Sequence, residues 1–92
     1  MRICKYELSF EAEQTIEIPE DCQILSVDSY DNRLVLWAAV DPEAPLCEQI
    51  FRVVTKEADM PDYDECIYIG TTTVRYTIAE IPCHVFVKAE EI

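Results

Sequence analysis

The residues best suited to chemistry are one histidine, five cysteines and many carboxylates. His84 directly follows Cys83, and a Cys–His pair can act as nucleophile and general base when the two side chains meet. Both lie in an alternating, strand-like run, Cys83–Lys88, where adjacent side chains point to opposite faces, so these two cannot meet. Cys4 or Cys66 could reach His84 from a neighbouring strand. The favoured interpretation is a structural histidine, no catalytic residues and no enzyme activity.

The cysteines are odd in number and widely spaced, with no C-x-x-C and no paired spacing for zinc. Neither a basic start followed by an apolar run nor a stretch of ~20 apolar residues is present, which predicts no signal peptide and no membrane span. We expect reduced, half-buried cysteines in a cytoplasmic protein, with no metal and no cofactor. Disulfides or a metal site remain the alternatives. The cysteines are Cys4, Cys22, Cys47, Cys66 and Cys83.

Carboxylates crowd one segment, Glu57–Glu65, which has a proline at its centre. An EF-hand calcium loop needs a glycine at its sharp turn and flanking helices, and this segment has Pro61 and no glycine. We therefore favour two other interpretations of this segment: a solvated loop that aids solubility, or a contact for a basic partner. Its acids are Glu57, Asp59, Asp62, Asp64 and Glu65.

The charge balance excludes whole classes of function. The 92 residues include 19 acids and 7 bases, a net charge of −12, which opposes direct binding to nucleic-acid phosphates. Half of the residues are apolar, which opposes an acidic disordered tail. Six acids lie between Glu7 and Asp21 and five in Glu57–Glu65. If both segments share one side, they form a negative surface that could imitate DNA; ordinary solubility is the alternative explanation.

Three arginines offer a different possibility. Arg33, Arg52 and Arg75 could converge, with Tyr30 and Trp37, on a small anionic ligand such as a signal nucleotide. The favoured interpretation is that each arginine is exposed on a strand and paired with a nearby acid, because the overall negative charge repels anions.

Alternation with a period of two residues predicts the elements that carry these side chains. The runs Cys4–Phe10 and Gln14–Ile18 are expected to form a hairpin. A second hairpin joins Gln23–Tyr30 to Arg33–Val40 through Asp31-Asn32, whose residue types tolerate the positive φ angles of a two-residue turn. Its register places Leu25, Val27 and Ser29 with Leu34, Leu36 and Ala38 on the core face, and Ser26, Asp28 and Tyr30 with Arg33, Val35 and Trp37 on the other.

The rest of the chain also reads as strands. The expected strands are Cys47–Lys56, Cys66–Thr72 and Cys83–Lys88, with Val74–Ile78 either a continuation or a separate edge piece and Pro82 a break. No helix is convincing beyond a short turn near Pro42–Gln49. About seven short strands with little or no helix predict an all-β fold, a small antiparallel sandwich or barrel, as a single domain over residues 1–92. Because so small a core is marginal, a homodimer is one way to add buried surface.

Several segments resemble a family of short tailed-phage and prophage proteins catalogued as a domain of unknown function. They span nearly the whole chain, and the most specific is the Trp–apolar–Asp-Pro-Glu-Ala-Pro portion. They are Lys5-Tyr6-Glu7-Leu8, Glu13-Gln14-Thr15-Ile16-Glu17-Ile18-Pro19, Ile24-Leu25-Ser26-Val27, Leu36-Trp37-Ala38-Ala39-Val40-Asp41-Pro42-Glu43-Ala44-Pro45, Tyr68-Ile69-Gly70-Thr71 and His84-Val85-Phe86. The resemblance implies a phage origin and the cytoplasm of an infected bacterium, and it supplies no catalytic residues.

The sequence thus predicts a phage-encoded acidic accessory protein that binds and inhibits a host or bacterial-defence protein with a basic surface, by imitating nucleic acid or otherwise. It predicts no direct contact with nucleic acid or membrane. The alternatives are a signal-nucleotide binder and a phage structural or assembly accessory protein. The expected partner-binding residues are Glu11, Glu13, Glu17, Glu57, Asp59, Asp62, Asp64 and Glu65 for charge, with Tyr30 and Trp37 as aromatic anchors.

Overall fold

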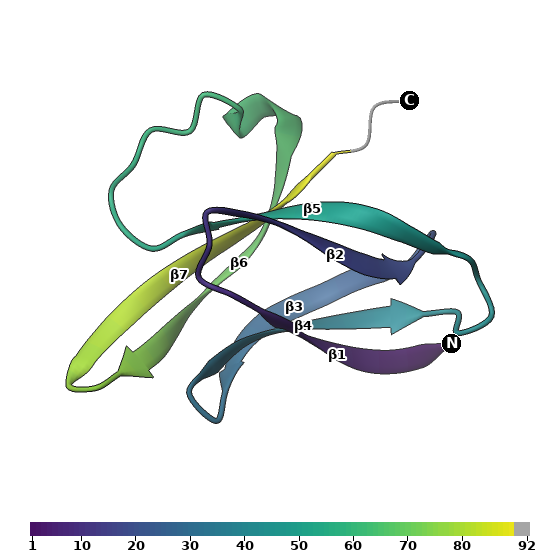
Figure 1. Ribbon diagram of the computed structural model, residues 1–92, viewed down its shortest axis with the longest axis horizontal. Coiled ribbons are helices and arrows are strands. Elements are labelled where there is room, and N and C mark those ends of the chain that lie inside the picture. Colours follow the sequence, from purple (N-terminus) through teal and green to yellow (C-terminus); the bar gives the residue numbers. More distant parts are fainter. Residues whose placement is uncertain (90–92) are drawn as a thin grey trace.

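The computed structural model describes residues 1–89, apart from the Tyr76 side chain, and these residues form seven strands in two antiparallel sheets (Figure 1). A single turn of 3₁₀ helix lies just before the sixth strand. The all-β prediction is therefore confirmed. The elements are β1 (Arg2–Leu8), β2 (Glu13–Pro19), β3 (Gln23–Tyr30), β4 (Arg33–Val40), β5 (Leu46–Val54), η1 (Tyr63–Glu65), β6 (Cys66–Tyr76) and β7 (Ala79–Lys88).

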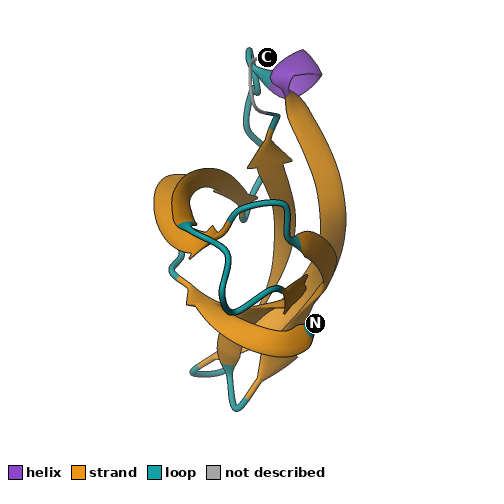
Figure 2. Ribbon diagram, turned by 90° about the vertical axis from the view of Figure 1, so that its right-hand side faces the viewer, coloured by secondary structure: helices purple, strands orange, loops and turns teal. Residues whose placement is uncertain are grey.

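The two sheets have the strand orders β1-β4-β3 and β2-β5-β7-β6 and enclose one main hydrophobic core. Leu8, Leu34 and Leu36 contribute from the three-stranded sheet, and Phe51 and Val85 from the four-stranded sheet; all five are at most 3% exposed. The strands curve around this core, and their curvature is seen in the turned view of Figure 2. Residues that alternate with the core positions therefore point outward, and each sheet presents an outer face to solvent.

The predicted hairpin between the first two strands is wrong. β1 pairs with β4 and β2 pairs with β5, so the connection from Ser9 to Ala12 crosses from one sheet to the other. The Gln14 side chain holds this crossing: it accepts a hydrogen bond from the Ser9 amide at 2.8 Å and donates to the Ser9 and Glu11 carbonyls. Both strands have an apolar face, and placing them in opposite layers buries both faces against each other.

The hairpin of β3 and β4 is confirmed, with one correction. Asp31 and Asn32 both have positive φ, 52° and 60°, as a two-residue turn requires. A β-bulge between Ile24 and Ser26 shifts the register, so that Ile24 packs against the core and Leu25 is 45% exposed. The bulge adds one residue to the strand, and that extra residue exchanges the faces of the residues before it.

The last two strands are longer than expected. β6 runs without interruption to Tyr76, and β7 passes through Pro82, which pairs with Thr73. Proline is tolerated there because β5 pairs with β7 only from His84 to Val87, so the other side of β7 at Pro82 needs no donor. The short turn considered near Pro42–Gln49 is present only at its start, where the Ala44 amide donates to the Asp41 carbonyl at 3.0 Å, because β5 begins at Leu46.

Candidate functional site

Three acids gather on the outer face of the four-stranded sheet. Glu13, Glu17 and Glu48 are exposed at outward positions of β2 and β5, and the registered pairs are Glu17 with Glu48 and Glu13 with Arg52. Directly opposed residues of an antiparallel pair share a face with their Cβ atoms about 5 Å apart, and like charges there are destabilising. Within residues 1–89, neither Glu17 nor Glu48 has a cationic partner. The sheet therefore holds an uncompensated carboxylate pair.

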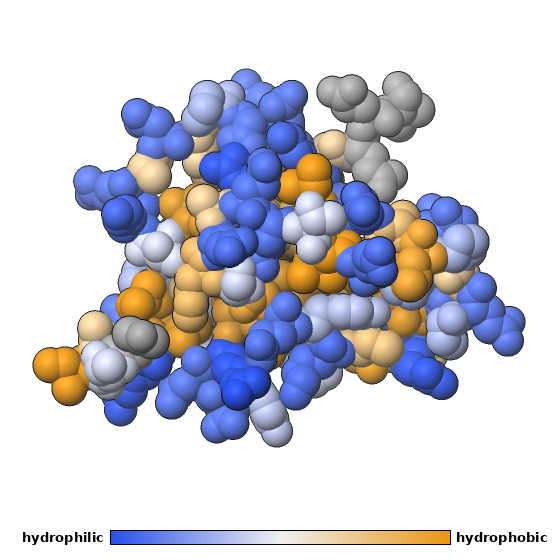
Figure 3. All heavy atoms as spheres, in the orientation of Figure 1, coloured by the Kyte–Doolittle hydropathy of each residue, from blue (hydrophilic) through white to orange (hydrophobic). Residues whose placement is uncertain are grey.

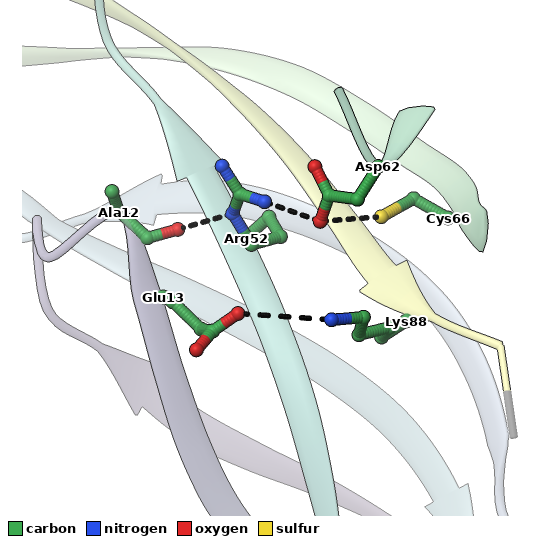
Figure 4. A network of polar contacts seen from close by, with 6 residues as sticks. All are labelled: Ala12, Glu13, Arg52, Asp62, Cys66 and Lys88. Atoms are coloured by element: carbon green, nitrogen blue, oxygen red, sulfur yellow. Dashed lines mark hydrogen bonds and ion pairs between the residues drawn. The ribbon is translucent and has the colours of Figure 1, made fainter. Parts of the chain in front are cut away.

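The predicted acidic loop, between β5 and β6, is tied to this same face (Figure 4). The Arg52 guanidinium donates from Nη1 to Asp62 Oδ2 and from Nε to the Ala12 carbonyl at 2.9 Å. The Cys66 thiol donates to the same Asp62 oxygen at 3.7 Å. Arg52 thus joins the loop, β5 and the sheet crossing, and it holds the loop on the side of the molecule where Glu13 and Glu17 lie. Glu7, from the same N-terminal acid-rich segment, lies on the other sheet.

The pKa values of Asp62 and Cys66 are shifted by their hydrogen bonds and by the partial burial of both side chains. The hydrogen bond from Arg52 lowers the pKa of Asp62 against the opposing effect of desolvation. Desolvation, followed by the nearby Asp62 charge, raises the pKa of the Cys66 thiol, which disfavours a reactive thiolate. Asp62 is consequently a structural anion whose charge is already matched by Arg52. Its role as an exposed partner contact, predicted from sequence, is not what its surroundings favour.

The remaining loop acids are exposed: Glu57, Asp59, Asp64 and Glu65. We call the outer side of β2 and β5 together with this loop the acidic face, defined by Glu13, Glu17, Glu48, Glu57, Asp59, Asp64 and Glu65. Two of its nearby cations are engaged, since Arg52 binds Asp62 and Lys88 lies 3.9 Å from Glu13. Hydrophilic residues predominate in the upper part of the view in Figure 3, where the loop lies, and hydrophobic surface shows below them.

Two aromatic side chains lie beside the acidic face, and sequence reasoning missed both. Tyr63 packs edge-on against Phe86 at 6.1 Å between ring centroids, and Tyr68 contacts the same ring at 5.4 Å. Tyr63 and Tyr68 are nevertheless 59% and 55% exposed. Tyr63 could have been noticed because it directly follows Asp62 in the acidic segment. Tyr68 could not, since its position depends on its pairing with Phe86.

The predicted aromatic anchors lie elsewhere. Trp37 and Tyr30 are on the outer face of the three-stranded sheet, on the opposite side of the core from the acidic face. Glu11 lies in the sheet crossing, where it lines an open hollow with Glu7 and Glu13. The structure therefore brings the acids Glu13, Glu17 and the loop together, and separates them from Tyr30 and Trp37.

The histidine is engaged away from the cysteines. His84 Nδ1 lies 2.9 Å from Thr71 Oγ1, and Thr71 also bonds the Tyr68 hydroxyl. Cys83 is fully buried on the inner face, as the strand alternation predicts. Cys66 pairs with Lys88, four residues along β7 from His84, and Cys4 lies in the other sheet. The His84 side chain thus contacts Thr71 and Cys83 points into the core, so these two neighbours do not form a catalytic pair.

The three arginines do not converge. Arg33 binds Glu7 at 3.0 Å on the three-stranded sheet, Arg52 binds Asp62, and Arg75 binds Glu80 at 3.3 Å near the β6–β7 turn. Each is thus paired with an acid, as the favoured interpretation held, but Arg52 differs from it in being largely buried instead of exposed. Among the described residues, no group of three or more His, Cys, Asp or Glu side chains is arranged to hold a metal ion. No helix formed by residues 1–89 is long and apolar enough to cross a membrane.

Comparison with known proteins identifies a family for the whole chain. A family model described as "Domain of unknown function (DUF7352)" matches residues 1–92. No curated protein and no solved structure matches the chain.

Proposed function

We propose that this chain, which belongs to the DUF7352 family of domains of unknown function, acts by binding a protein partner that has a basic surface, through the acidic face. The observation that carries the proposal is the Glu17–Glu48 pair, two exposed carboxylates held opposite each other with no cationic partner in the part of the chain that the structure describes. A partner's lysine or arginine placed between them would gain from both charges and relieve their repulsion.

The loop strengthens this interpretation because it is anchored. The ion pair of Arg52 with Asp62 and the backbone bond from the Ala89 amide to the Glu65 carbonyl, 2.8 Å, fix both the loop and η1. A held loop loses less conformational freedom on binding than a free one, so more of its charge attraction appears as affinity. Complementary charge also accelerates association.

Aromatic contacts would add to the charge. Tyr63 and Tyr68 are exposed yet supported from beneath by Phe86, an arrangement that offers area at low entropic cost. Tyrosines in such positions frequently dominate binding energy. We therefore assign the anchoring role, predicted for Tyr30 and Trp37, to Tyr63 and Tyr68.

The resemblance to tailed-phage and prophage proteins supports a more specific version. The chain would be phage-encoded, would act in the cytoplasm of the infected bacterium, and would inhibit a host or defence protein whose basic surface normally receives nucleic acid. Duplex DNA carries about one charge per 1.7 Å of axis, so a dense carboxylate array can occupy the same site.

The test is capture from a bacterial lysate over a series of salt concentrations, followed by mass spectrometry. Screening weakens exposed charge pairs, so the captured protein should be released as salt rises, and added duplex DNA should compete with the chain for it. Binding that persists at high salt would contradict recognition by charge. Release by salt but not by DNA would contradict the imitation of nucleic acid, and would leave recognition by charge in place. Capture of a phage capsid or tail protein would favour an assembly role instead.

The variants Glu17→Lys and Glu48→Lys test the face itself. A matched control is Glu43→Lys, which changes the net charge equally at an exposed position in the β4–β5 loop. The proposal expects the first two to lose the partner and the control to retain it.

A further inference from the structure

The outer face of the three-stranded sheet differs in charge from the rest of the molecule. Its outward positions hold two cations, Lys5 and Arg33, and two anions, Glu7 and Asp28. The face is therefore neutral, in a chain whose net charge is −12. We call it the balanced face, and define it by these four residues with Ile3, Leu25, Tyr30 and Trp37.

The balanced face exposes apolar side chains that nothing in the described chain covers. Ile3 is 57% exposed, Tyr30 58% and Leu25 45%, and half-buried Trp37 lies between Ile3 and Tyr30 on the central strand. The β-bulge displaces Leu25 from the core and adds it to the exposed apolar surface.

Its side chains are already fixed by contacts across the sheet. The Lys5 ammonium lies 4.3 Å from the centroid of the Tyr30 ring and so spans from β1 over β4 to β3. Arg33 binds Glu7 at 3.0 Å beside it. Val35 lies beneath these two bridges and is only 2% exposed although it faces outward. These contacts hold Lys5, Tyr30, Glu7 and Arg33 in place before any partner arrives, which reduces the entropic cost of binding.

We propose that the balanced face binds a second copy of this chain in a two-fold dimer. Two copies repel each other strongly through their net charge, and a neutral face offers an approach without local repulsion. In a two-fold arrangement each face meets itself, so the Lys5 and Arg33 cations of one copy can lie near the Glu7 and Asp28 anions of the other. The acidic faces then point away from each other, and both remain open.

The size of the face limits the affinity. Three strands of seven or eight residues present a surface of roughly 15 by 25 Å, or about 400 Å² per copy, which is below the standard size of specific interfaces and in the range of weak, transient ones. We therefore expect a reversible dimer in the micromolar range and not an obligate one. Because screening reduces the repulsion between two chains of charge −12, added salt should strengthen the dimer. Salt thus has the opposite effect on the dimer and on the partner of the acidic face.

The test is sedimentation equilibrium of the full chain over about two decades of concentration around the micromolar range, at about 0.05 M and about 0.5 M NaCl. Trp37 is the only tryptophan, so its fluorescence reports on this face directly. The proposal expects monomers to associate to dimers, more tightly in high salt, with a blue shift of the emission that follows the dimer fraction. A monomer under all these conditions would overturn it.

A matched pair of substitutions locates the interface. Ile3→Asp places a charge on the balanced face, and it should weaken association by more than about tenfold because the change occurs twice in a two-fold dimer. Ile78→Asp makes the same change at a fully exposed position in the β6–β7 turn, and should leave the dimer intact. If Ile3→Asp alters the fold by circular dichroism, Leu25→Asp replaces it. A dimer unaffected by either change on the face, or equally weakened by Ile78→Asp, would contradict the proposal.

Discussion

Arg52 donates a hydrogen bond to Asp62, ten residues away along the chain, and this ion pair holds the acidic loop against the outer face of the four-stranded sheet. Both side chains are largely buried, 17% and 14% exposed, so solvent screens their attraction less than that of a surface pair. This contact and the backbone hydrogen bond from Ala89 to Glu65 hold the loop in position, and the loop extends the acidic face beyond β2 and β5.

Replacement of Asp62 by asparagine should destabilise the fold in a pH-dependent way. The pKa of Asp62 is lowered in the folded chain, so its contribution is fully present above the ordinary aspartate value near 3.8 and is lost as pH falls through the lowered folded value. Chemical denaturation of wild type and Asp62→Asn should therefore differ at neutral pH and converge in strong acid. Asp59→Asn, an exposed change in the same loop, should show no such pattern. A constant difference at all pH values would contradict the assigned role.

Glu48→Lys should make the chain more stable. It converts the opposed Glu17–Glu48 carboxylates into an attractive pair, a change of about 0.5–1 kcal/mol, or a few degrees in Tm at low salt. Thermal unfolding by circular dichroism measures it. Glu43→Lys lowers the net negative charge equally, and an equal gain there would show that total charge, not the pair, is responsible.

Thr77→Gly should also stabilise the chain. Thr77 begins the two-residue turn between β6 and β7 with a φ of 55°, a conformation that is unfavourable for a β-branched side chain and ordinary for glycine. Relief of that conformation should raise the free energy of unfolding by about 1 kcal/mol. Thr73→Gly is the matched control in the middle of β6, where glycine weakens a strand. A loss of stability from Thr77→Gly would refute the turn assignment.

Gly70→Ala should cost stability because β3 passes close to β6. An added Cβ at Gly70 would lie 3.2 Å from Val27 Cγ2, so Val27 must move by a few tenths of an ångström. We expect a loss of about 1 kcal/mol in urea denaturation. In a Val27→Ala background the same change should cost little, and the double-mutant cycle measures this coupling. Equal costs in both backgrounds would contradict the contact.

The local sequence patterns predict where the strands lie better than they predict which strands pair with each other. Alternation identified the strands, and Asp31-Asn32 identified the turn, because both are dictated by neighbouring residues. The separation of β1 and β2 into different sheets depends on which apolar faces meet in the core, and the displacement of Leu25 depends on a bulge that no local pattern marks.

The candidate site was predictable in composition but not in arrangement. The acid-rich segments are evident from the sequence, whereas Glu48 joins them only through its register with Glu17. Tyr30 and Trp37 were correctly placed on one face of their hairpin. That this face is opposite the acids follows from the packing of two sheets, which a single hairpin does not reveal.

The most direct test of the central claim compares capture of the lysate partner by wild type, by Glu48→Lys and by Glu43→Lys, at low salt. The account predicts that wild type and Glu43→Lys retain the partner while Glu48→Lys, although more stable than wild type, loses it. Equal capture by all three chains would show that the acidic face is not the binding surface.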